Sequence, residues 1–247
     1  MTTQPSADGR IEIGSVLNKV IETYSATAGV LIPGAVVVFL PVALLAAAFA
    51  GSAGGFIVAL AAMVASVWYS GMVARTVQDV QDGRVDATLG ELFQSVTPML
   101  GQLIVLGILA GLGILVGLVL LIVPGLILLT IWAVAAPAVV IESKDALAAM
   151  RRSRELVGGH GWTVFGVIVV VFAGLMVLSI VVGSIGAISD SFVLTFIVQL
   201  ALNVAVAPVY ALAAAVLYFA LLGAHGEVAP LIIPPLPSTP SSPVPAA

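Results

Sequence analysis

The strongest constraint in this sequence is the length of its stretches without charge. Lysine, arginine, aspartate and glutamate are absent from residues 23–74, 92–141, 156–189 and 191–226. A helix needs about 20 apolar residues to cross the hydrocarbon core of a bilayer. The first two stretches are therefore long enough for two crossings each, and the last two for one each. Gly- and Pro-containing turns divide the long stretches, and the predicted spans lie near residues 29–49, 55–77, 99–122, 125–141, 162–186 and 191–222.

The composition excludes a water-soluble fold. Of the 247 residues, 61% are hydrophobic and 8% are charged, whereas about 25% of residues are charged in a typical soluble domain. The predicted fold class is all-α: a polytopic membrane bundle of six transmembrane helices with cytoplasmic interfacial amphipathic helices. The chain contains no cysteine, which excludes disulfides and thiolate metal sites.

The basic residues predict the orientation of the chain. Two precede the first span, two lie between spans 2 and 3, and four lie between spans 4 and 5: Arg10, Lys19, Arg75, Arg84, Lys144, Arg151, Arg152 and Arg154. The turns on the opposite side carry no lysine or arginine. Basic loops stay in the cytoplasm, so both termini are predicted to be cytoplasmic.

An amphipathic stretch precedes each pair of spans, and helices of this kind lie in the headgroup plane of a membrane. Ser143 is the predicted N-cap of the third stretch, and Thr88 and Glu91 have capping-box spacing in the second. The apolar faces comprise Ile13, Val16, Leu17, Val20, Ile21 and Tyr24; Leu89, Leu92, Phe93 and Val96; and Ala146, Leu147, Met150 and Val157.

These elements predict one membrane domain over residues 11–222, built from three units of a surface helix and a hairpin. The units lie near residues 11–77, 86–141 and 143–222, and their origin by duplication is a hypothesis. Residues 1–10 are predicted to be disordered. Seven of the fourteen prolines lie after residue 229, a composition that cannot bury a core, so residues 223–247 are predicted to form a disordered, Pro-rich cytoplasmic tail.

Arg151, Arg152 and Arg154 are the leading candidates for a binding site. Guanidinium groups bind phosphate with paired hydrogen bonds, and a basic residue beside the membrane contributes about 1 kcal/mol of attraction to anionic lipid. The alternative is that these arginines only fix the topology and pair with acidic neighbours. Glu142 and Glu155 are the candidates for such structural ion pairs, and Glu155 has the favourable i, i+4 spacing from Arg151.

Gln199, Asn203 and Tyr210 fall within roughly 40° of one another on the predicted sixth span. They are candidates for polar residues of the bundle interior, where they would line a solute pathway or hydrogen-bond a neighbouring helix. Span 3 contains the pairs Gly107/Gly111 and Gly113/Gly117. This spacing favours close helix packing, within the chain or between copies.

No catalytic or metal-binding signature is present, since HExxH, GxxxxGK and GxSxG are all absent. Asp79 and Asp82, with Arg75 one turn before them, are predicted to form a capped, solvated helix end after span 2. The chain is therefore expected to be non-enzymatic, with no catalytic residue, no metal and no cofactor.

Three segments carry a resemblance to a known family: IEIGSVLNKVIETYSATAGVLIPG, VQDVQDGRVDATLGELF and PGLILLTIWAVAAPAVVIESKDALAAMRRSRELVGGHGW. Over residues 10–222 the chain resembles the YciC-like family of bacterial inner-membrane proteins, and it is similar to the membrane domain of some glycerophosphodiester phosphodiesterases. The resemblance implies a six-helix domain of a bacterial cytoplasmic membrane. The sequence shows no soluble phosphodiesterase barrel, so no hydrolase activity carries over. The most specific positions are Pro137, Glu142, Arg151, Arg152, Ser153 and Trp162.

The favoured functional hypothesis is a non-enzymatic membrane protein that engages anionic phospholipid through its surface helices, together with a protein partner or a second copy of the chain. Nucleic acid is not an expected partner. The alternative is a transporter or channel for a small apolar or amphipathic solute, although the spans carry no ionisable residue well inside the membrane. A membrane-embedded lipid enzyme that uses Glu142 is the third hypothesis.

Overall fold

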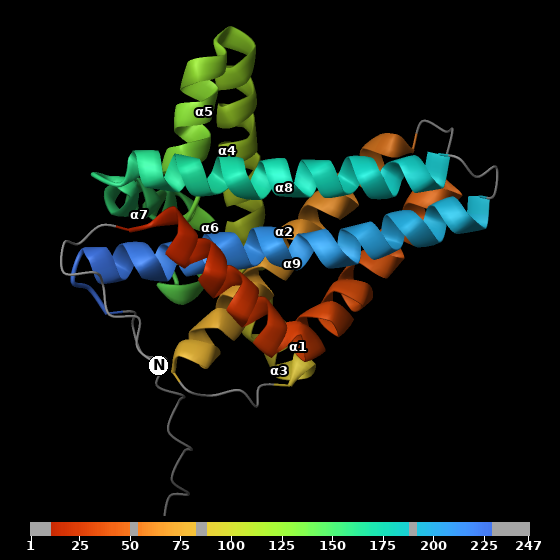
Figure 1. The fold of residues 1–247 in the computed structure, drawn as a ribbon, viewed down its shortest axis with the longest axis horizontal. Helices are drawn as coiled ribbons and strands as arrows, with labels where there is room; N and C mark the ends of the chain where they lie inside the picture. Colours follow the sequence, from red (N-terminus) through yellow and green to blue (C-terminus); the bar gives the residue numbers. More distant parts are fainter. Residues whose placement is uncertain (1–10, 50–53, 83–87, 188–191, 229–247) are drawn as a thin grey trace, which may run out of the picture.

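The structure is a computed structural model that describes residues 11–49, 54–82, 88–187 and 192–228. The described residues form helices and turns and contain no strand (Figure 1). The elements are α1 (Ile13–Ala48), α2 (Gly55–Gln81), α3 (Leu89–Val96), the 3₁₀ turn η1 (Thr97–Met99), α4 (Leu100–Leu120), α5 (Ile122–Ile131), α6 (Ala135–Ile141), α7 (Ala146–Val157), α8 (Gly161–Ala187) and α9 (Phe192–Ala224).

The prediction of an all-α fold with six spanning helices is confirmed. Six helical segments of the described chain are long and apolar enough to cross a membrane, α5 and α6 together forming the fourth. The predicted disordered ends at residues 1–10 and 229–247 lie outside the described residues. Residues 223–228, predicted to begin the disordered tail, instead belong to the folded domain, because α9 continues to Ala224 and Glu227 contacts α7.

Helix α9 forms the centre of the bundle, and α1, α2 and α8 pack against it. The first residues of α1, the whole of α7, the start of α8 and the end of α9 gather at one end of the molecule, on the left of Figure 1. Tyr69 of α2 is buried and donates a hydrogen bond to the Leu31 carbonyl of α1 at 2.9 Å. This carbonyl lies in the turn that contains Pro33, and Figure 1 shows α1 bent near its middle.

The first amphipathic stretch is not a separate surface helix, which corrects the sequence-based expectation. It is the beginning of α1, whose helix runs without interruption into the first span. Val16 and Val20 are buried against the bundle, whereas Ile21 is exposed. The second and third stretches form the short helices α3 and α7, as expected. The predicted capping box of α3 is present: Thr88 N–H donates to Glu91 Oε2 at 2.9 Å, and the Thr88 hydroxyl accepts from Glu91 N–H.

Helices α4 and α5 form a hairpin that stands steeply to α8 and α9 in Figure 1. Its two helices touch at glycine: a Cβ added to Gly117 would lie 2.9 Å from the Cα of Gly125, and one added to Gly125 would lie 2.6 Å from the backbone nitrogen of Leu118. Gly111, by contrast, faces open space. The glycine spacing of span 3 therefore serves packing within the chain at Gly117, and Gly111 takes no part in that packing.

The fourth span is broken between α5 and α6. Residues 132–134 form a turn, and Pro137 is the third residue of α6. In a continuous helix the ring of Pro137 would collide with the carbonyl of Ala133, four residues earlier. The break therefore falls where that collision would occur. Pro137 is tolerated in α6 because an N–H in the first helical turn has no partner within its own helix.

Candidate functional site

Helix α7 joins the fourth and fifth spans and organises the polar residues of this end of the molecule. Its N-cap is Asp145, whose Oδ1 accepts a hydrogen bond from Ala148 N–H at 2.7 Å. The prediction of Ser143 as N-cap is wrong, because Ser143 lies two residues before the cap with a left-handed φ of 51°. The helix ends at Val157 with Gly158 as its C-cap, and Gly159 adopts a φ of 83° that glycine accommodates without strain.

Ser153 attaches α7 to the break in the fourth span. Its side chain is fully buried, its hydroxyl donates to the carbonyl of Ile131 at 2.8 Å, and its Oγ accepts from Val134 N–H at 3.3 Å. These two backbone groups flank the turn between α5 and α6, where helical hydrogen bonding is interrupted. A single serine hydroxyl thus satisfies one donor and one acceptor that the break would otherwise leave unpaired.

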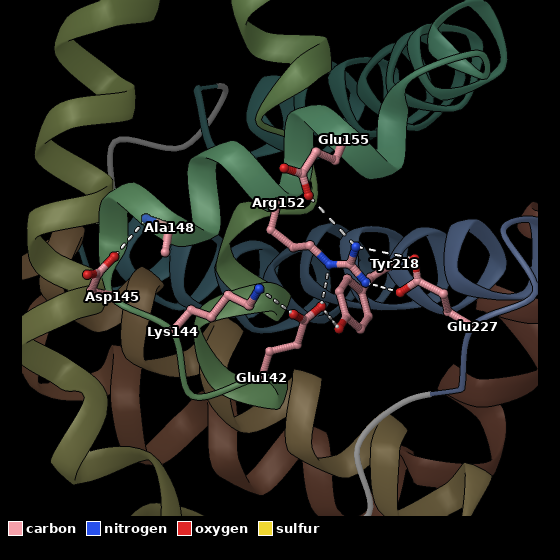
Figure 2. A network of polar contacts seen from close by, with 8 residues as sticks. All are labelled: Glu142, Lys144, Asp145, Ala148, Arg152, Glu155, Tyr218 and Glu227. Carbon is pink, nitrogen blue, oxygen red and sulfur yellow. Dashed lines mark hydrogen bonds and ion pairs between the residues drawn. The ribbon is translucent and has the colours of Figure 1, made fainter.

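Glu142, the residue after α6, is the centre of a polar cluster that we call the Glu142 network: Glu142, Lys144, Arg152, Tyr218 and Glu227 (Figure 2). Arg152 Nε donates to Glu142 Oε1 at 3.0 Å, and Tyr218 O–H donates to the same oxygen at 2.6 Å. Lys144 Nζ lies 3.0 Å from Glu142 Oε2. The remaining nitrogens of Arg152 contact both carboxylate oxygens of Glu227. The network thus joins α6, α7 and the end of α9.

The network fixes the charges of its members. Burial by itself would raise the pKa of the Glu142 carboxyl, but hydrogen bonds from Tyr218, Arg152 and Lys144 outweigh burial and lower the pKa below its ordinary value. The pKa of Arg152 is raised, above all by its hydrogen bonds to Glu227. The pKa of Glu227 is lowered by the same contact. The network therefore holds an ionised carboxylate between two cations, and such a group is suited to joining helices.

The three arginines of α7 lie in two different environments. The Arg152 side chain is 16% exposed and lies in the Glu142 network. Arg151 and Arg154 are exposed, and neither takes part in an ion pair among the residues that the structure describes. Leu147 lies four and seven residues before them, on the same helical face, and is 60% exposed. One face of α7 thus combines an unburied apolar side chain with two outward arginines.

Sequence reasoning missed the residues that reach the network from a distance. Tyr218 and Glu227 are separated from Glu142 and Arg152 by 76 and 75 residues, and no local spacing indicates such a contact. Glu155, the other predicted ion-pair residue, is 69% exposed and only approaches Arg152 at 3.9 Å, whereas the helical spacing favours a pair with Arg151. An ion pair this exposed contributes little.

The polar residues predicted for the bundle interior lie elsewhere. Asn203 is exposed and Tyr210 is 42% exposed on α9, while the side chain of Gln199 is not among those that the structure describes. The prediction of an interior stripe is therefore wrong for Asn203 and Tyr210. The physical reason is that α9 buries a different face, which carries Leu212, Ala215 and Tyr218, against its neighbours.

Comparisons with protein families, curated proteins and solved structures give no match to this chain. The described residues contain no group of three or more histidine, aspartate or glutamate side chains that could hold a metal ion. Six long apolar helices, whose outward side chains are themselves largely apolar, define the chain as an integral, multi-pass helical membrane protein.

Proposed function

We propose that this chain is a non-enzymatic membrane protein that binds anionic phospholipid at the exposed face of α7, on the cytoplasmic side of its membrane. The observation that carries the proposal is the separation of roles among neighbouring arginines. Arg152 is engaged by Glu142 and Glu227, whereas Arg151 and Arg154 are exposed beside Leu147. A helix face with apolar and basic side chains suits a membrane surface, where the apolar group enters the acyl region and guanidinium groups meet phosphate.

Two further features support a position at the membrane surface. Trp162, in the first turn of α8, is 85% exposed, and tryptophan is enriched at the boundary between lipid and water. The Glu142 network, in turn, holds α7 in place against α6 and α9, so the outward arginines are carried by a fixed helix. The resemblance to the YciC-like family of bacterial inner-membrane proteins agrees with this proposal, and Arg151 and Trp162 are among the residues that carry that resemblance.

Lipid selectivity tests the proposal directly. In nanodiscs that contain spin-labelled phosphatidylglycerol or phosphatidylcholine, the fraction of motionally restricted label reports association with the protein. We expect phosphatidylglycerol to be favoured, and Arg151→Gln and Arg154→Gln to reduce that preference by roughly fivefold each, since a basic residue contributes about 1 kcal/mol. Lys19→Gln, which removes a charge from α1, is the matched control. Equal preference in all four proteins would refute the proposal.

The orientation has its own test. The chain has no cysteine, so a single introduced thiol reports its own location. Ser143→Cys lies beside the Glu142 network, and Ser184→Cys lies near the opposite end of α8. With a membrane-impermeant thiol reagent added outside intact cells, we expect Ser184→Cys to be labelled and Ser143→Cys to be protected until the membrane is opened. The reverse pattern would refute a cytoplasmic α7.

A further inference from the structure

A second feature of the bundle lies on α2, away from the Glu142 network. Arg75 is 7% exposed, whereas Gln81 and Asp82 at the end of α2 are exposed. Arg75 lies six residues before the end of α2, about 9 Å along the helix axis. Its face of the helix is covered: a Cβ added to Gly71, one turn earlier, would meet Val96 of α3 at 2.6 Å and Leu103 of α4 at 3.2 Å.

The buried guanidinium of Arg75 is incompletely hydrogen-bonded. One terminal nitrogen donates to Gln78 Oε1 at 3.2 Å, and the other reaches Met99 Sδ at 3.7 Å, although thioether sulfur is a weak acceptor. The Nε–H group is buried and has no acceptor within the described ranges of the chain. A charged group with an unpaired donor in the protein interior is costly. The carboxylate of Asp79, one turn later on α2, supplies a nearby negative charge to Arg75, but it leaves the Nε–H group without an acceptor in the described part of the chain. A further anionic acceptor would satisfy that donor.

The same face of α2 carries a second buried donor, the indole N–H of Trp68, which also lacks an acceptor among the described residues. Seven residues separate Trp68 from Arg75, which places them on one helical face about 10 Å apart along the axis. The Trp68 ring packs edge-on against Phe93 of α3, with ring centroids 4.9 Å apart, and Arg75 contacts Met99 in the turn that follows α3. Both donors therefore lie where α3 and η1 cover α2.

We propose that Arg75 and Trp68 form a binding site for a phosphate-bearing ligand between α2 and the α3–η1 segment. Guanidinium donates to phosphate with favourable geometry. A phosphoglycerolipid offers two kinds of acceptor at two depths, a phosphate near the membrane surface and ester carbonyls below it. This order matches Arg75 near the end of α2 and Trp68 further inside. Inorganic phosphate shares the first acceptor only. The site shares no residue with the outward face of α7.

Fluorescence quenching of Trp68 tests this site. The chain has three tryptophans, and the difference in emission between Trp162→Phe and the double variant Trp68→Phe/Trp162→Phe isolates the signal of Trp68. In nanodiscs with a small fraction of lipid brominated near the glycerol, we expect phosphatidylglycerol to quench Trp68 more strongly than phosphatidylcholine. Arg75→Gln should abolish that preference. Arg151→Gln/Arg154→Gln should leave it unchanged, which separates this site from the proposed site on α7.

Two further arms decide the ligand and protect against a variant that does not fold. Trp68→Phe keeps an aromatic ring and removes only the N–H. In an Arg151→Gln/Arg154→Gln background, which removes the proposed site on α7, we expect it to lower phosphatidylglycerol retention in native mass spectrometry by roughly fivefold, since a hydrogen bond between neutral groups contributes about 1 kcal/mol. Inorganic phosphate that shifts Trp68 emission in phosphatidylcholine nanodiscs would identify a free anion as the ligand. The proposal would be overturned if Trp68 emission responded to neither the lipid headgroup nor inorganic phosphate and if Trp68→Phe left phosphatidylglycerol retention unchanged. That result would show that only buried water satisfies the Arg75 and Trp68 donors.

Discussion

Replacing Ser153 by alanine should destabilise the bundle far more than the removal of an exposed hydroxyl. The substitution leaves the Ile131 carbonyl and the Val134 N–H without their side-chain partner in a fully buried place. An unsatisfied buried backbone group costs about 1–3 kcal/mol. Because the hydrogen bond from Val134 N–H is long at 3.3 Å, its loss should cost an amount at the lower end of that range. The expected decrease in the free energy of unfolding is about 2–3 kcal/mol.

The assay is unfolding in mixed detergent micelles, followed by helical circular dichroism. Ser25→Ala is the matched control, since the Ser25 hydroxyl also donates to a backbone carbonyl, at 2.8 Å, but on an exposed part of α1. We expect this control to change stability by less than about 0.5 kcal/mol. Hydrogen exchange at the Val134 amide should accelerate selectively in Ser153→Ala. Equal stability of the two variants, with unchanged exchange at Val134, would refute the role of Ser153 in closing the helix break.

Three further predictions concern the Glu142 network and the α4–α5 hairpin. Glu142→Gln should lower the free energy of unfolding by about 1–3 kcal/mol, a limited loss because Arg152 keeps Glu227 as a partner. Tyr218→Phe should lower it by about 1–2 kcal/mol. If both variants unfolded at the same denaturant concentration as wild type, the Glu142 network would have no stabilising role. The lowered pKa of Glu142 means that its stabilising effect is present above the ordinary value of 4.5 and is lost as pH falls through the folded-state pKa. The difference in unfolding midpoint between wild type and Glu142→Gln should therefore be largest above the ordinary value of 4.5 and narrow as the pH falls below it, and a difference that does not change with pH would exclude titration of this carboxyl. Gly117→Ala should destabilise the α4–α5 hairpin by about 1–3 kcal/mol, because the added methyl group would collide with Gly125. Gly111→Ala should be neutral or slightly stabilising. Equal thermal unfolding midpoints of the two variants would contradict the close contact between Gly117 and Gly125.

The fold could be predicted from the sequence because a bilayer imposes simple rules on length and charge. Charge-free stretches indicated all six apolar helices, and their number is confirmed. What the sequence left undetermined was whether an amphipathic stretch lies apart from a span or continues into it. Residues 13–24 have the apolar spacing of a surface helix, yet no glycine or proline separates them from the first span until Gly29. The helix therefore continues, and Val16 and Val20 pack against the bundle.

The candidate site was only partly predictable, for a related reason. The cluster of arginines was visible in the sequence, but which arginine faces the protein depends on the rotation of α7. That rotation follows from Ser153, which must face the helix break, and from Tyr218 and Glu227, which come from the far end of the chain. Helical spacing alone gives relative directions within one helix. It cannot say which direction is inward until a long-range partner is known.

The central claim is that Arg151 and Arg154 bind anionic lipid while Arg152 holds the fold together. Native mass spectrometry of the protein, released gently from its own membranes, tests this claim most directly because it reads retained lipid and oligomeric state together. In an Arg75→Gln background, which removes the second proposed lipid site, we predict that the protein retains anionic phospholipid and that adding Arg151→Gln/Arg154→Gln abolishes this retention without changing the unfolding midpoint. Arg152→Gln should instead lower the midpoint. Retention of the same lipid after Arg151→Gln/Arg154→Gln is added to Arg75→Gln would contradict the account.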